Sequence, residues 1–325
     1  MPDGVKYVLA PIAGFTNAAF RLMATRGGAD MTFTEMVSAA GLSHGSSPTR
    51  HLLEVLPGEG PVACQLFGSV PDELAYSARE VSALGRFVEL NLNAGCPVPR
   101  IVREGAGSAL VTKPELVYGL LAAMVAETDL PVTLKTRPGP RPDRVLMLEL
   151  LDAAEKAGAK GIDLHARFTS QNHGGEVHLD LLAELVRASH IPVTGNGGVR
   201  DAATARAMAE TGVSAIMIGR EALRDPYVFA AIKGAPSRPA AKSLFLDHLE
   251  MIKALHAQTA AAFPGDRLPT IDAWMCCAVR THLFRYFAGM PGVGELRRRL
   301  FSASTEDEIR LLVESFGNQI DRRLE

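Results

Sequence analysis

The chain is poor in cysteine, and none of its cysteines has a spacing typical of metal binding or redox chemistry. Its four cysteines include no C-x-x-C pair, and the adjacent Cys276 and Cys277 are poorly placed for a disulfide or a zinc site. No H-E-x-x-H motif is present, and ligand-type spacing is also missing at His44, His51, His173 and His178. We therefore expect no metal site and a reducing, cytoplasmic setting.

Long apolar runs and an excess of positive charge are also missing. No uncharged apolar run approaches the ~18 residues that span a membrane, and residues 1–4 do not begin a signal peptide. The formal net charge is −2, from 34 Lys and Arg against 36 Asp and Glu. A polyanionic partner would therefore have to bind a local basic patch. The absence of a Walker A loop, a G-x-S-x-G elbow and a G-x-G-x-x-G strand–helix turn argues against P-loop, hydrolase and Rossmann enzymes.

Short β-rich runs alternate with helical patterns through the first 235 residues. The predicted strands cover 7–10, 31–36, 62–67, 87–93, 132–137, 161–166, 193–196 and 215–218. The helical patterns between them include 114–127, 143–157, 179–188 and 201–211. Eight such units predict an α/β fold, a closed parallel (β/α)8 TIM barrel with its site at the carboxyl ends of the strands. A doubly wound sheet is the alternative, although it usually has fewer strands and a single switch point.

The chain continues beyond the length of one barrel. Its 325 residues exceed the about 250 of a typical (β/α)8 domain. Residues 236–243 are rich in proline and alanine and are predicted to be a linker. Only helical patterns follow, at 244–263, 271–288, 293–300 and 305–319. We therefore predict a barrel domain over 1–235 and a small helical-bundle domain over 244–325.

The segment 91–97 places a cysteine at the end of the fourth predicted strand. A strand cannot absorb Gly95 and Pro97, so Cys96 lies where the strand gives way to a loop. Asn93 is three residues upstream and can point into the same space. A buried structural thiol is the alternative, because free cysteine is among the most buried residue types.

Other predicted strands also end in residues suited to chemistry. Glycines at 195–198 and at Gly219 follow the seventh and eighth strands, where backbone N–H groups can approach a phosphate and Arg220 can add charge. Ordinary turn glycines are the alternative. Lys135 ends the fifth strand and could stabilise negative charge on a cofactor ring, or it could be an outward, solvated lysine.

Two further strand ends carry weaker signals. Gln65 ends the third strand, and its amide can both donate to and accept from a ring with mixed edges. His165 ends the sixth strand, where a lone histidine is more often a core residue, and Glu35 is the weakest candidate. Together these residues indicate a barrel enzyme that binds a phosphate-bearing cofactor, with Lys135, His165 and Cys96 facing the reacting centre.

The order of these motifs resembles the tRNA-dihydrouridine synthase family of bacterial type. The similar segments are 10–17, 65–68, 91–97, 135–137, 165–167, 195–198, 218–220 and 286–292, of which 91–97 is the most specific. The chain departs from the family's usual residues at Ala94, at 166–168 and at Gly198. The family often has Cys or Met, Gly-Arg-Thr, and Asp at these places.

The resemblance implies that FMN binds at the barrel mouth. The matched cofactor-binding positions are Pro11, Ile12, Ala13, Gln65, Lys135, His165, Asn196, Gly197, Gly198, Gly219 and Arg220. Gln65 would bond the ring edge, Lys135 would lie near N1 and O2, and the last five positions would hold the phosphate. The matched substrate-binding positions are Asn93 and Arg167.

The resemblance also implies a reaction in two halves. NADPH, or alternatively NADH, would reduce the FMN, and the flavin would pass a hydride to C6 of a tRNA uridine. Cys96 would protonate C5 from the opposite face, since a thiol with an ordinary pKa of about 8.5 stays protonated near neutral pH. The uridine would leave its stack to reach the flavin. Arg297 and Arg298 would contact the tRNA, and the chain is expected to act as a monomer.

Two other functions stay open at this point. An FMN barrel acting on a free pyrimidine would use the same phosphate loops and a comparable acid, but it would leave the arginine-bearing helices without a clear role. A catalytically silent RNA-binding protein on the same scaffold is the second alternative, and the intact Cys96 and Lys135 argue against it.

Overall fold

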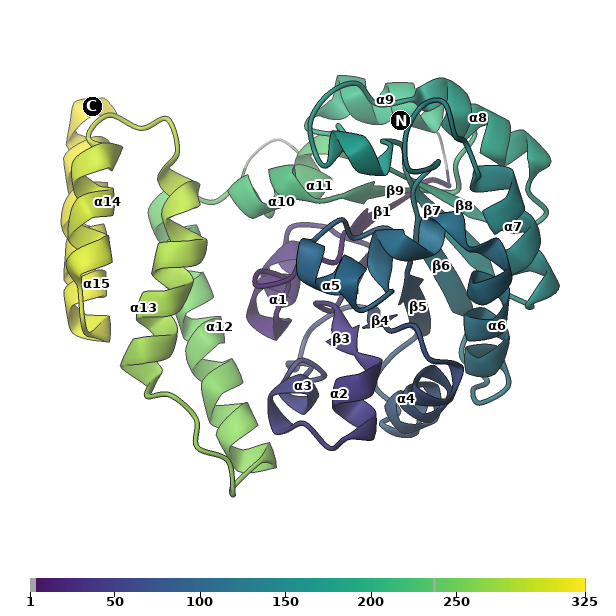
Figure 1. Cartoon of the computed structure of the whole chain (residues 1–325). Coiled ribbons are helices and arrows are strands. Elements are labelled where there is room, and N and C mark those ends of the chain that lie inside the picture. The colour runs from purple at the N-terminus through teal and green to yellow at the C-terminus, as the bar shows by residue number, and fades with distance from the viewer. Residues whose placement is uncertain (1–3, 236–237, 325) are drawn as a thin grey trace.

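A closed ring of parallel strands forms the centre of the protein, and helices surround it (Figure 1). The computed structural model describes residues 4–235 and 238–324, and for 318–324 it describes the backbone alone. The strand order is β2-β1-β9-β8-β7-β6-β5-β4-β3, and an additional β2–β4 pairing closes the ring. The strands are β1 (Lys6–Leu9), β2 (Met31–Phe33), β3 (Val37–Ser38), β4 (Val62–Phe67), β5 (Glu89–Asn93), β6 (Val132–Thr136), β7 (Gly161–His165), β8 (Val193–Asn196) and β9 (Ala215–Ile218). The predicted TIM barrel is therefore confirmed.

The second predicted strand, 31–36, is wrong as a single strand. The chain forms β2 and then β3, with Thr34, Glu35 and Met36 between them. The backbone N–H of Gln65 in β4 donates to the Thr34 hydroxyl at 3.0 Å, in place of a strand carbonyl. Glu35 lies outside both strands, and its carboxylate accepts a hydrogen bond from the backbone N–H of Gly14. Side-chain partners thus interrupt the ladder at this point.

Helices of the barrel layer follow most strands, as the apolar periodicity predicts. They are α1 (Ala18–Arg26), α2 (Ala39–Ser43), α3 (Ser47–His51), α4 (Pro71–Ala83), α5 (Pro99–Arg103), α6 (Pro114–Val125), α7 (Met147–Lys156), α8 (Leu179–Ala188), α9 (Ala202–Ala209), α10 (Arg220–Arg224) and α11 (Val228–Ile232). The sequence analysis did not predict α2, α3, α5 and α10, and α7 begins four residues later than predicted. The α8 bounds agree with the prediction.

The interior of the barrel has one apolar side and one polar side. The apolar side is a small cluster of Val8, Ala10, Phe33, Ala63 and Met217, which come from β1, β2, β4, β9 and the segment after β1. The polar side comes mainly from β4 to β8 and consists of buried residues that include Gln65, Asn91, Asn93, Thr133, Asp163 and Asn196. Buried polar groups require hydrogen-bond partners, so this polar side has to be an ordered network.

The C-terminal helices lie beside the barrel, and α12 packs against α1 (Figure 1). They are α12 (Ala241–Ala262), α13 (Ile271–Thr281), the 3-10 helix η3 (Leu283–Phe287), α14 (Val293–Ser302) and α15 (Glu306–Leu324). Helix α12 begins within the predicted linker 236–243, of which residues 236 and 237 lie outside the described residues. Within the described chain, no helix is both long and apolar enough to span a membrane.

One predicted helix, 271–288, is interrupted at His282. The backbone of His282 leaves the helical region, with φ −138° and ψ −58°, and its Nε2 bonds the carbonyl oxygen of Leu223 at 3.1 Å. The imidazole packs edge-on against Phe20 of α1, with ring centroids 4.6 Å apart. This break therefore joins the C-terminal helices to the barrel.

Arg21 holds the loop between β1 and α1 in place from inside the protein. Its guanidinium donates to Glu59 at 2.8 Å, to the Glu54 carbonyl at 2.6 Å and to the Thr16 carbonyl at 3.1 Å. Both charged side chains are fully buried, with 0% exposed area. A charge left alone at such a site is strongly destabilising.

We predict that Arg21→Met lowers the free energy of unfolding by about 3–5 kcal/mol, because it leaves the buried Glu59 carboxylate without its partner. Urea unfolding followed by circular dichroism measures the change. The matched control is the double variant Arg21→Met with Glu59→Leu, which removes both charges and should recover part of the loss. A double variant less stable than the single one would contradict this account.

Candidate active site

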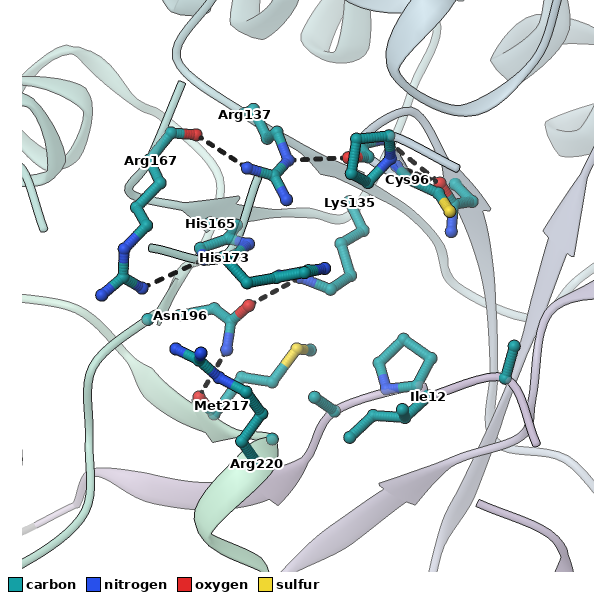
Figure 2. Close-up of a pocket in the computed structure, with 18 of the residues that line it drawn as sticks. Ile12, Cys96, Lys135, Arg137, His165, Arg167, His173, Asn196, Met217 and Arg220 are labelled. Carbon is teal, nitrogen blue, oxygen red and sulfur yellow. Dashed lines mark hydrogen bonds between the residues drawn. The ribbon is translucent and has the colours of Figure 1, made fainter. Parts of the chain in front are cut away.

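A cavity of about 660 Å³ opens at the carboxyl ends of the barrel strands. Figure 2 shows Lys135, His165 and Asn196 on one side of it, with Ile12 across the opening. Of the candidate site residues predicted in the barrel, Glu35 does not line it. The others do, namely Pro11, Ile12, Ala13, Gln65, Asn93, Cys96, Lys135, His165, Arg167, Asn196, Gly197, Gly198, Gly219 and Arg220. Residues more than 200 positions apart in the chain thus meet in one site.

Cys96 lies on the loop after β5, which is held from two directions. The Asn93 side-chain oxygen accepts hydrogen bonds from the backbone N–H groups of Gly95 at 3.1 Å and Cys96 at 3.0 Å. On the other side, the Arg137 Nε donates to the carbonyl oxygen of Gly95 at 2.7 Å. Figure 2 shows Arg137 next to the cysteine loop. The loop conformation is therefore set by side chains of β5 and of the segment after β6.

The environment of Cys96 favours its neutral thiol. Partial burial raises the pKa of the Cys96 thiol above its ordinary value, and the nearby charge of Arg137 only partly opposes this effect. The thiol is therefore protonated near neutral pH and can give up a proton, which is the behaviour of an acid rather than of an activated nucleophile.

Lys135 is fixed in the wall of the cavity rather than solvated outside the barrel. Its Nζ donates to the Asn196 side-chain oxygen at 3.1 Å, and the Asn196 amide donates in turn to the Met217 carbonyl at 2.7 Å. Burial lowers the pKa of Lys135 to about 8, and the negative charge of Asp163 partly opposes this effect. An ammonium group so placed can stabilise negative charge that develops on a ligand.

One end of the cavity suits an anion. Gly197 and Gly198 have φ values of 123° and 75°, a region that favours glycine, and a Cβ on Gly198 would lie only 2.8 Å from Val177. Arg167 and Arg220 also line this end. Bare backbone beside two guanidinium groups fits a phosphate. Within the described residues, no cluster of His, Cys, Asp and Glu could hold a metal ion.

Two histidines meet beside this cationic end. The rings of His165 and His173 stack with centroids 5.8 Å apart. Burial holds the pKa of His165 well below its usual range, and the charges of Lys135, Arg137 and Arg167 act in the same direction. His165 is therefore a neutral side chain at neutral pH, able to donate and accept hydrogen bonds.

The sequence analysis missed Arg137 and His173 as cavity residues. A signal for Arg137 was present, because it is two residues after Lys135 and alternate residues of a strand point to the same side. His173 had no comparable signal, since the irregular segment after β7 carries it into the cavity.

Arg297 and Arg298 lie on α14 and do not line the cavity. The Arg297 guanidinium stacks over Phe284 and Phe301, at 4.9 and 5.0 Å from the ring centroids, and Arg298 pairs with Glu295. Arg285 continues this group of exposed cations, because it lies over both Phe284 and the cavity residue Phe15. These arginines therefore extend outward from the cavity rim.

The chain has clear relatives among known proteins. Residues 8–321 match the family described as Dihydrouridine synthase (Dus). The chain is 33% identical over 326 residues to a Mycobacterium tuberculosis protein named "Probable tRNA-dihydrouridine synthase", covering 96% of this chain and 82% of that protein. It is 33% identical over 299 residues to tRNA-dihydrouridine synthase B of Pseudomonas putida, covering 90% of this chain and 85% of that protein. A solved mandelate oxidase is similar with a TM-score of 0.45 and 20% identity, over 78% of this chain and 74% of that chain.

We predict that iodoacetamide modifies Cys96 more slowly than Cys277 at pH 8, because only the thiolate reacts and burial raises the pKa of Cys96. Each unit by which a pKa is raised lowers the thiolate fraction about tenfold. Cys277 is the exposed internal control in the same chain. Peptide mass spectrometry over a pH series gives both rates. If Cys96 and Cys277 were alkylated at equal rates at pH 8, and the rate for Cys96 did not rise at higher pH, the prediction that the Cys96 thiol is protonated would be contradicted.

Proposed function

The chain belongs to the dihydrouridine synthase family of flavin-dependent oxidoreductases, and from this premise we propose that it reduces uridine in tRNA to 5,6-dihydrouridine. We propose FMN as the bound flavin and NADPH as the electron donor. The observation that supports this function best is the presence in one cavity of the Cys96 thiol, the Lys135 ammonium and a glycine-lined cationic end.

The residues present fit a phosphate-bearing flavin. The bare backbone of Gly197 and Gly198 and the charge of Arg220 suit the phosphate, and Asn196 and Gly219 complete that end. Pro11, Ile12, Ala13, Gln65 and His165 line the other part of the cavity and would hold the ring. Lys135 would stabilise negative charge on the N1/O2 side of the reduced ring. When bound, the reduced flavin supplies the hydride that C6 of the uracil accepts.

We assign to Cys96 the proton that C5 of the uracil needs. Addition of a hydride at C6 leaves negative charge at C5 and O4, and a proton from the Cys96 Sγ completes the saturated bond. The raised pKa of Cys96 keeps that proton on the sulfur until the base is in place. The resulting thiolate recovers a proton from solvent, to which the partly buried loop gives access.

We assign Asn93 and Arg167 to the substrate side of the cavity. Within the protein, the Asn93 amide oxygen already accepts two backbone hydrogen bonds, and its nitrogen donates to Gln65 and to the Met36 sulfur. A thioether is a weak acceptor, so a uracil carbonyl could displace Met36 at little cost. Asn93 would then touch the base without releasing the Cys96 loop.

We propose that residues 244–325 form a tRNA-binding domain joined to a catalytic domain over 1–235. The supporting observation is the group of exposed arginines that runs from Phe15 at the cavity rim to Arg297 and Arg298 on α14. Cationic side chains next to aromatic rings suit a phosphate backbone with exposed bases. We expect the protein to act as a monomer in the cytoplasm.

Mass spectrometry of tRNA from cells that lack the protein tests this function. Loss of dihydrouridine at one or a few positions, restored by the wild-type chain, would support the proposal. An unchanged tRNA profile in cells without a redundant homologue would overturn it. Reduction of free uracil by the purified protein, with none on tRNA, would indicate instead an enzyme for a free pyrimidine.

We predict that Cys96→Ala abolishes nearly all dihydrouridine formation but leaves FMN binding and reduction by NADPH intact. The substitution removes the proton donor and leaves the glycine-lined end and Lys135 unchanged. General-acid catalysis typically contributes about 10²–10⁴-fold, so turnover should fall by that order. Flavin absorbance under anaerobic conditions measures the reductive half, and tRNA mass spectrometry measures the product. Full turnover in this variant would exclude Cys96 as the acid.

We predict that Arg297→Ala combined with Arg298→Ala weakens tRNA binding and lessens its dependence on salt, because each lost phosphate contact reduces the slope by about 0.7–0.9. Fluorescence anisotropy over a salt series measures both quantities. The matched control is Arg187→Ala with Arg206→Ala, which removes the same charge from exposed positions on α8 and α9. If the salt-dependence slopes of the two double variants were equal, α14 would not be part of the RNA-binding surface.

A further inference from the structure

A line of buried amides runs through the barrel interior to the Cys96 loop. The Asn91 nitrogen donates to the Asp163 carboxylate at 3.0 Å, and the Asn91 oxygen accepts from the Gln65 nitrogen at 2.7 Å. The Gln65 oxygen accepts from the Asn93 nitrogen at 2.8 Å, and the Asn93 oxygen accepts from the backbone N–H of Cys96 at 3.0 Å. We call Asp163, Asn91, Gln65 and Asn93 the amide relay.

The two ends of the amide relay fix the direction of every bond within it. Backbone N–H groups can only donate, so the oxygen of Asn93 has to face the Cys96 loop. Burial raises the pKa of the Asp163 carboxyl, and the charge of Lys135 opposes this effect. In its ionised form the carboxylate can only accept, and the nitrogen of Asn91 then faces it. Both constraints give the same orientation for the amide of Gln65 in the middle. The oxygen and nitrogen positions of all three amides are therefore mutually consistent.

The amide relay is buried along its whole length. Gln65 and Asn91 have no exposed surface, and Asp163 and Asn93 have 4% and 6%. The strand register brings the members together. Gln65 on β4 is the pairing partner of Asn91 on β5. Lys135 on β6 is the pairing partner of both Asn93 on β5 and Asp163 on β7, so these two residues lie at the same level of the barrel. In this setting an amide that turned over would place two oxygens or two N–H groups against each other, which is costly without water.

We infer that Asn91 and Asp163 are positioning residues, which act through Gln65 and Asn93 to orient the Gln65 amide and to hold the Cys96 loop in the conformation that the reaction needs. This inference rests on the proposed function, since it gives a role to residues that touch neither base nor flavin. Within the amide relay, Gln65 uses one of its two N–H groups and one of its two lone pairs. It therefore keeps one donor and one acceptor that the amide relay does not use, in a fixed orientation.

Exchanging the side chains of Asn91 and Asp163 tests whether these residues orient the amide relay or only fill space. Asn91→Asp alone places a second carboxylate against Asp163, so the amide relay can form only if one of the two acids takes up a proton. Adding Asp163→Asn removes that conflict. The new carboxylate at position 91 still accepts from Gln65, and the new amide at position 163 donates to it. The direction of the bonds at Gln65 and Asn93 is thus kept with the charge moved to the other residue.

The experiment measures Cys96 alkylation in flavin-free protein together with dihydrouridine formation on tRNA. We expect Asn91→Asp and Asn91→Leu to raise the alkylation rate several-fold, because the loop loses its support. We expect turnover to fall about a hundredfold, the typical effect of a displacement of about 1 Å. The double swap should return both quantities toward wild type. The matched control is Thr32→Val, since the buried Thr32 hydroxyl has no hydrogen-bond partner among the described residues, and it should change neither.

The outcomes distinguish this inference from the proposed function. Wild-type alkylation and turnover in correctly folded Asn91→Leu would overturn the inference. If that variant does not fold, the comparison between Asn91→Asp and the double swap decides, and the absence of any recovery in the swap would overturn it. Alkylation needs neither flavin nor tRNA, so a wild-type protein that forms no dihydrouridine would refute the proposed function while the alkylation pattern still tested the amide relay.

Discussion

The site depends on one constraint, which is that the polar side chains inside the closed barrel are buried away from bulk solvent. The closed ring of strands surrounds the interior. One side of the interior is filled by Val8, Ala10, Phe33, Ala63 and Met217. On the other side each polar group has to be satisfied by a neighbour. Because the ring of strands fixes where these neighbours are, the hydrogen-bond directions in the floor of the cavity are determined before any ligand binds.

Burial also shifts the pKa values of the ionisable groups in the cavity, and so determines which of them are charged near pH 7. It raises the pKa of the Cys96 thiol and holds that of His165 well below its usual range, so both are neutral near pH 7. It also lowers the pKa of Lys135 to about 8, but the charge of Asp163 and the hydrogen bond to Asn196 favour the ammonium form. A neutral acid and a cation within one cavity suit a reaction in which a hydride and a proton arrive separately.

The sequence predicted the fold and the members of the site better than it predicted how they interact. The β4, β8 and β9 bounds follow from the apolar runs, and the residues at strand ends meet because parallel strands of a barrel end at one rim. The break between β2 and β3 could not be read, since it depends on Thr34 bonding to Gln65, a residue 31 positions away. Asn91 lies in the segment 91–97 but was assigned no role for the same reason, because its partners come from β4 and from β7, two strands away in the barrel.

The size of the cavity explains why the C-terminal helices matter to the proposed function. About 660 Å³ is within the usual range for a small-molecule site, and it cannot hold a folded RNA. Most of a tRNA would therefore have to bind outside the cavity and deliver a single unstacked base into it. Phe15 links the two regions, because it lines the cavity, packs edge-on against His282 with ring centroids 5.7 Å apart, and lies beneath the guanidinium of Arg285. Phe15 therefore connects the lining of the cavity with the arginine-bearing helices, over which the tRNA would lie in the proposed function.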